Sequence, residues 1–224
     1  MRSVGILGGM GPEATILLMQ KVLGAVTAQD DADHLPLIVH QNPQVPSRIK
    51  ALLEGGGEDP GPVLAAMAQD LERAGAQALA MPCNTAHHYA DAVREASGLP
   101  FLDMLELTAA HLAALGAKRI GMLASPATRR VGVFDRVFAA HGLSPVWTGD
   151  EAEMLAIIRA VKAGEPMAPL GPRLRGLADA MAGADHWLVA CTELSLMTGA
   201  LEGGPGWTDS LDCLVAGVAE FGFA

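Results

Sequence analysis

Two cysteines stand at equivalent places in a stretch that occurs twice in this sequence. Cys83 follows a short apolar run and a proline, and Cys191 follows a second apolar run. Gly75 and Cys83 recur with the same spacing as Gly183 and Cys191. Each apolar run predicts a buried strand, and the polar residues after each cysteine predict a turn into a helix. Free N–H groups and the helix dipole favour thiolate over thiol in such a turn, so the pattern indicates two reactive cysteines rather than two core residues.

The third cysteine provides the contrast. Cys213 lies in a helical apolar pattern, and we expect it in the core. An odd number of cysteines without an export signal indicates free thiols rather than disulfides. The sequence starts directly with a strand and lacks a signal peptide, so we expect a cytoplasmic protein.

Composition limits the classes of function. The chain has 224 residues, half of them hydrophobic, and a formal net charge of −10. The acidic balance argues against nucleic acids and anionic membranes, which need a basic face. No apolar run is long enough to span a bilayer. An acidic ligand would therefore need local cations and N–H groups that act against the overall field.

Strand and helix patterns alternate along the chain. Residues 119–125 repeat the pattern of residues 3–9, and a last helix near 210–221 has no counterpart in the first half. We predict an α/β protein of two pseudo-symmetric domains, each a parallel sheet flanked by helices, with residues 1–100 plus 209–224 in one and 101–208 in the other. Ligands of such sheets bind where strand C-termini face each other, so the cysteines should lie on opposite walls of an inter-domain cleft. The expected strands are 4–7, 37–40, 78–81, 143–147 and 187–190, and the expected helices are about 12–28, 62–74, 153–163, 172–182 and 210–221.

Two other interpretations of the motifs are weaker. Residues 9–14 (Gly-Met-Gly-Pro-Glu-Ala) fit a dinucleotide fingerprint, but the candidate acidic partners precede the second strand instead of ending it. The same loop could offer N–H groups to a small carboxylate. Cys83 and His87 could share a helix face, but no spacing matches a zinc signature, and we expect no metal. His87 more simply acts electrostatically or caps the site.

Two cations are candidates for binding an acidic group. Considered alone, Arg48 or Lys162 would be interpreted as a solvated surface charge. Arg48 is the better candidate, because it follows a stiff loop with two prolines and bidentate binding of a carboxylate favours a fixed backbone.

Four motifs in this order resemble the aspartate/glutamate racemase family, nearest to its PLP-independent aspartate racemases. The motifs occupy residues 5–12, 42–48, 81–87 and 191–193, and the resemblance covers essentially the whole chain. It implies a cofactor-independent amino-acid racemase, with aspartate or glutamate as substrate and a homodimeric assembly. Removing the α-hydrogen from one face and returning a proton to the other suits two thiols on opposite walls. No pattern suggests a PLP-binding lysine.

The resemblance also implies roles for individual residues. Cys83 and Cys191 match the acid/base pair of the family, and Arg48 and Lys162 match cations that hold the substrate's carboxylates. Polar residues expected at the α-amino and α-carboxylate groups are Asn84, Thr85 and Thr192. Met10 and Glu193 complete the expected substrate-binding set.

Some features depart from the family pattern. Ser47 replaces an acidic residue before the arginine, and His88 adds an imidazole beside His87. A glycine-rich segment, residues 203–207, replaces the apolar strand before the last helix, so we expect an irregular return to the first domain. Related maleate isomerases, arylmalonate decarboxylases and hydantoin racemases remain alternatives, as do a broad-specificity racemase and a small-acid-binding protein without catalysis.

Overall fold

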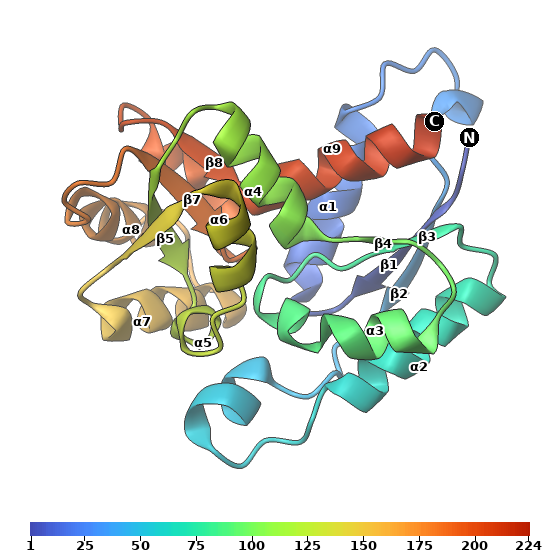
Figure 1. Cartoon of the computed structure of the whole chain (residues 1–224), viewed down its shortest axis with the longest axis horizontal. Helices are drawn as coiled ribbons and strands as arrows, with labels where there is room; N and C mark the ends of the chain where they lie inside the picture. Colours follow the sequence, from blue (N-terminus) through green and yellow to red (C-terminus); the bar gives the residue numbers. More distant parts are fainter.

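The computed structural model describes residues 1–224, which form two parallel sheets built on one plan (Figure 1). The first sheet has the strand order β2-β1-β3-β4, and the second has the equivalent order β6-β5-β7-β8. All neighbouring strands are parallel. The recurrence of both order and direction confirms the predicted pair of pseudo-symmetric α/β halves.

The first half alternates strands and helices around a buried centre. The central strands β1 (Val4–Gly8) and β3 (Ala78–Ala80) are buried throughout, which explains their uninterrupted apolar and small residues. A 3-10 helix, Thr85–Tyr89, follows β3 after a connection of residues 81–84. The remaining elements are α1 (Pro12–Gly24), β2 (Leu37–Gln41), a π-helix (Lys50–Glu54), α2 (Gly61–Arg73), α3 (Ala90–Ala96) and β4 (Phe101–Leu102), with a short 3-10 turn at Asp31–Asp33.

The second half repeats this alternation. Its central strands are β5 (Arg119–Ala124) and β7 (His186–Ala190), and a 3-10 helix, Leu194–Leu201, follows β7. The other elements are α4 (Met104–Ala114), α5 (Pro126–Arg130), α6 (Asp135–His141), β6 (Ser144–Trp147), α7 (Glu151–Lys162), α8 (Leu170–Asp179), β8 (Trp207–Asp209) and α9 (Ser210–Phe223).

Helices α4 and α9 join the halves. Helix α9 leaves the second sheet after β8 and runs beside α1 and α4 (Figure 1). Its side chains Leu211, Leu214 and Val218 share one core cluster with Val4 and Leu18 of the first half. None of the helices is both long and apolar enough to cross a membrane.

The structure corrects several sequence-based expectations. Helix α1 ends at Gly24, before the predicted residue 28, and α4 and β4 were not predicted. Where we expected an irregular return, β8 forms a short strand paired with β7. Gly204 lies against the Trp187 ring, where a Cβ atom would come within 2.1 Å of the ring, so glycine allows the chain to pass over this side chain.

Candidate active site

A cavity of about 510 Å³ is lined by both halves. Its walls come from the loops that follow β1, β2, β3, β5 and β7 and from α7, so it lies at the carboxyl ends of the strands, where open α/β sheets bind ligands. All nine residues predicted for the site line it: Met10, Arg48, Cys83, Asn84, Thr85, Lys162, Cys191, Thr192 and Glu193.

The two cysteines occupy equivalent positions. Cys83 follows β3 and Cys191 follows β7, which hold the same place in their sheets. Both are buried, at 8% and 7% exposure, and each precedes a helix, which in both halves is a 3-10 helix. Such a tight turn still leaves its first N–H groups without partners inside the helix. The fold therefore brings two thiols and two sets of free donors to one cavity.

Cys191 is part of a charged group. Its Sγ donates to Glu193 Oε2 over 3.0 Å, and Glu193 Oε1 pairs with Lys162 Nζ. Burial raises the pKa of Cys191 well above its ordinary value, and the Glu193 carboxylate adds to this shift while Lys162 opposes it. Burial alone would lower the pKa of Lys162, but Glu193 reverses the shift, so this pKa is raised. The ammonium of Lys162 is thus already paired inside the protein.

Arg48 differs from Lys162 in its partners. Its Nη1 donates to the carbonyls of Val45 (3.2 Å) and Pro46 (2.9 Å), which belong to the stiff loop after β2. Its Nε is buried and has no hydrogen-bond partner. Because Nη1 is anchored by the loop, the guanidinium is held in one orientation at the wall of the cavity.

The residues after each cysteine connect the two halves. Asn84 Nδ2 donates to Ser210 Oγ (2.9 Å), and Thr192 Oγ1 donates to the carbonyl of Pro82 (3.2 Å). Thr85 and Thr128 share a hydroxyl hydrogen bond of 2.8 Å. These groups line the cavity but are partly engaged by the protein. Asn84 Oδ1 remains a buried acceptor without a partner.

Close packing against a neighbouring backbone explains the glycine at position 9 in the loop after β1. Gly9 has φ +94°, and a Cβ atom there would lie 2.4 Å from the Asn42 backbone. The Gly9 N–H donates to Thr15 Oγ1 over 2.9 Å. Glycine is therefore needed for the close approach of two backbones, which places Met10 in the cavity wall.

Three further wall residues were missed by the sequence analysis. Glu13 lies in the first turn of α1, Ser125 caps α5, and Ile158 lies one turn before Lys162 on α7. The repeat of residues 3–9 at 119–125 could have located Ser125, and helical spacing from Lys162 could have located Ile158. No sequence signal distinguished Glu13 from an ordinary first-turn carboxylate.

Disulfide bonds and metal ligation are the other chemistries open to cysteine. All three cysteines are free, as predicted. No group of three or more His, Cys, Asp or Glu side chains could hold a metal ion. His87 does not bond the Cys83 thiol, because its Nδ1 contacts the Cys83 carbonyl at 2.8 Å.

Comparisons with known proteins agree with this geometry. A family model described as Asp/Glu/Hydantoin racemase matches residues 7–219. The chain is 24% identical to the broad-specificity amino-acid racemase RacX of Bacillus subtilis, over 94% of each chain. It superposes with a TM-score of 0.90 on an aspartate racemase of Picrophilus torridus, at 26% identity and covering 100% of this chain and 95% of that one. A putative Asp/Glu racemase of Yersinia pestis superposes with a TM-score of 0.84 at 23% identity over the whole of both chains.

Proposed function

The chain belongs to the Asp/Glu/hydantoin racemase family and is an amino-acid racemase, and we propose that it works without a cofactor, with Cys83 and Cys191 as acid and base. One observation carries this proposal. Two free thiols, contributed by equivalent turns of two equivalent sheets, line the same cavity. Inverting an α-carbon requires a base on one face and an acid on the other, which this duplication supplies.

In one direction, the Cys83 thiolate takes the α-proton and becomes a thiol. The Cys191 thiol gives its proton to the opposite face of the carbanion and becomes a thiolate. The roles exchange in the other direction, so the chemistry is general acid–base catalysis. Free N–H groups at the start of each 3-10 helix are suited to the charge that develops on the α-carboxylate.

The surroundings of Cys191 support its role as the resting acid. Burial and Glu193 raise the pKa of Cys191, which keeps the thiol protonated. Lys162 opposes the shift and stabilises the thiolate that remains after proton donation. We therefore reassign Glu193 and Lys162 from direct substrate contacts to groups that control Cys191.

Arg48 supports an acidic substrate, and we propose aspartate. Its guanidinium at the cavity wall suits the distal carboxylate, since burying an unpaired carboxylate is costly. Asn84 Oδ1 is an acceptor suited to the α-ammonium. The Picrophilus torridus relative, an aspartate racemase, agrees with this choice.

A broad-specificity racemase is the second candidate. A cavity of about 510 Å³ exceeds the needs of a four-carbon amino acid, and it contains the apolar Ile158 as well as the carboxylate of Glu13. The Bacillus subtilis relative carries this description.

A panel of L- and D-amino acids tests both candidates. Racemisation is followed by polarimetry, after dialysis of the protein against EDTA, with an absorbance scan for PLP. We expect aspartate to be turned over fastest and dialysis to leave the rate unchanged. Equal turnover of neutral amino acids would support broad specificity, and absence of turnover with every amino acid would contradict the proposal.

We also propose that the protein is a homodimer. Ile16, Met19 and Leu23 are exposed apolar side chains at helical spacing on α1, an arrangement typical of an association surface. Light scattering coupled to size-exclusion chromatography should give twice the chain mass of 23.2 kDa.

A further inference from the structure

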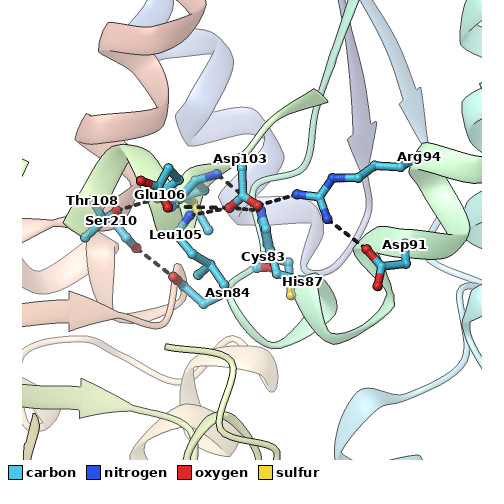
Figure 2. A network of polar contacts seen from close by, with 11 residues as sticks. Cys83, Asn84, His87, Asp91, Arg94, Asp103, Leu105, Glu106, Thr108 and Ser210 are labelled. Atoms are coloured by element: carbon cyan, nitrogen blue, oxygen red, sulfur yellow. Dashed lines mark hydrogen bonds and ion pairs between the residues drawn. The ribbon is translucent and has the colours of Figure 1, made fainter. Parts of the chain in front are cut away.

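His87 is fully enclosed four residues after Cys83, and both of its ring nitrogens have partners. Nδ1 lies 2.8 Å from the carbonyl oxygen of Cys83. Nε2 accepts a hydrogen bond of 3.3 Å from the Met104 N–H, at the first position of α4. Figure 2 shows the network around these groups, with the Arg94 guanidinium reaching Asp103 from α3.

These contacts define the tautomer. A backbone N–H can only donate, so Nε2 must carry a lone pair. The ring proton therefore resides on Nδ1, which donates to the Cys83 carbonyl. A protonated imidazole would direct a second N–H at the Met104 donor. His87 thus fits its site as a neutral ring and is not a proton carrier.

The surrounding charges are balanced without a charge on His87. Asp103 Oδ1 lies 3.9 Å from Nε2, but it already accepts from the N–H groups of Leu105 and Glu106. Its other oxygen pairs with Arg94. Burial lowers the pKa of His87, and Arg94 acts in the same direction, while Asp103 and the Cys83 carbonyl oppose the shift.

We propose that His87 is a positioning residue, a neutral clamp that holds the Cys83 backbone to the amino end of α4 and so fixes the Cys83 thiol over the substrate. The proposal rests on the proposed function of Cys83. The two N–H groups that follow Met104 in α4 are satisfied by Asp103, so the cysteine turn is tied to a fully capped helix. Helix α4 in turn packs against α9 and α6, and Met104 belongs to the core cluster that contains Val4 of the first half.

The second half lacks this clamp. The Cys191 carbonyl accepts from the Leu194 backbone N–H over 2.8 Å. Ser195, at the position equivalent to His87, donates to Asp209 instead (2.9 Å). A side chain therefore controls the backbone of only one of the two cysteines.

Replacing His87 by asparagine or by glutamine distinguishes its hydrogen bond to Cys83 from its hydrogen bond to Met104. In His87→Asn, the side-chain amide can still donate to the Cys83 carbonyl. In His87→Gln, the longer side chain can accept from Met104 N–H but cannot maintain the bond to Cys83. Misplacing a reacting group by about 1 Å can cost about 100-fold in rate. We expect kcat to fall about 10- to 100-fold in His87→Ala and His87→Gln, with KM changed less than threefold, and His87→Asn to recover much of the loss.

The exposed neighbour provides the matched control. His88→Ala removes an imidazole that makes no hydrogen bond and should keep wild-type kcat. Melting temperatures are measured for all variants. If Asn, Gln and Ala at position 87 lower kcat equally, or only in proportion to the melting temperature, the role is structural and the proposal is wrong.

A second measurement needs no substrate. Iodoacetamide alkylation, followed by peptide mass spectrometry, reports the reactivity of each thiol. We expect His87→Ala to change the alkylation rate of Cys83 at least threefold and to leave that of Cys191 unchanged. If wild type racemises nothing, the proposed function fails, yet this result still decides whether His87 controls Cys83. Equal changes at both cysteines, or none, would contradict the clamp.

Discussion

The two cysteine turns share a plan and differ in what surrounds the thiol. In each half, the residue four positions after the cysteine faces an aspartate that caps the next long helix. His87 lies beside Asp103 at the start of α4, and Ser195 donates to Asp209 at the start of α9. Duplication has therefore kept an aspartate cap beside each turn, although only Ser195 forms a hydrogen bond to its aspartate.

The chemistry next to each thiol has diverged. The second residue after Cys191 is Glu193, which bonds the thiol and pairs with Lys162. The equivalent residue after Cys83 is Thr85, which instead bonds Thr128 of the other half. The Cys191 thiol thus contacts the Glu193–Lys162 ion pair, whereas the Cys83 turn is held through a hydrogen bond to its backbone carbonyl. Equivalent positions in the two halves therefore have different electrostatic surroundings.

Removing either thiol should give the largest effect. General acid–base groups contribute about 10²–10⁴-fold, and each face needs its own. We expect Cys83→Ala and Cys191→Ala each to lower racemisation at least about 10³-fold, while exchange of the α-proton in D₂O persists on the face that keeps its thiol. Chiral chromatography and NMR measure the two processes.

Cys213→Ala is the matched control, because this cysteine is buried in α9 outside the cavity. It should retain most of the activity. Near-wild-type racemisation by Cys191→Ala would contradict the two-base mechanism and make the comparison of the two turns irrelevant to catalysis.

Arg48→Ala should have the next largest effect. Losing one partner of a buried charge pair costs about 2–5 kcal/mol, or roughly 30- to 5,000-fold in kcat/KM for aspartate. Neutral amino acids should lose far less. Lys50→Ala, an exposed cation on the same segment, should have no effect. An equal loss for all substrates would instead assign Arg48 to the α-carboxylate.

The sequence predicted the site best where reactive residues lie in short local motifs. The spacing of glycine and cysteine located both turns, and the Pro-rich loop located Arg48, because these features are local. The Lys162–Glu193 pair could not be predicted, since its members lie on α7 and after β7 and meet only in the fold. Nor could the His87 contact with Met104 be predicted, because it depends on where α4 begins.

Helix α4 was missed for a physical reason. It packs against α9 and α6 through a buried face that includes Met104, Leu105 and Leu112. Its exposed face carries Ala110 and Ala114 beside Glu106 and His111, so the two faces differ little in hydrophobicity and the sequence shows only a weak helical pattern. The domain boundaries near this helix, predicted at residues 100 and 209, remain a prediction.

Glu193→Gln tests the divergence at Cys191 directly. Glu193 raises the pKa of this thiol, so neutralising it should lower that pKa. We expect faster alkylation of Cys191 at pH 8, an unchanged Cys83, and a fall in kcat of roughly tenfold from a weaker resting acid. Glu13→Gln, the other cavity carboxylate, is the control. A slower reaction of Cys191 would contradict the assignment.

The two aspartate caps should affect stability rather than chemistry, and in opposite directions. Burial raises the pKa of Asp209 from 3.8 to about 6, and its Oδ2 has no partner. The native state therefore holds a proton that the unfolded state releases between about pH 4 and 6, and stability falls as the pH rises through this window. Asp103 differs: burial would raise its pKa, but the N–H groups that it caps and the Arg94 guanidinium lower it, so its contribution is present at neutral pH and lost in acid.

The substitutions Asp209→Asn and Asp103→Asn test this difference in the pH dependence of stability. Asp209→Asn keeps an oxygen for Ser195 and Leu211 and removes the buried charge, so we expect the free energy of unfolding at pH 8 to rise by up to about 3 kcal/mol. The gain should shrink towards pH 4. Asp103→Asn should lose stability at pH 8, and this loss should shrink as the pH falls. Urea unfolding at pH 4.5, 6 and 8 measures both. If the two variants shift stability in the same direction at pH 8, the caps are electrostatically alike, and the divergence of the two halves is confined to the cavity.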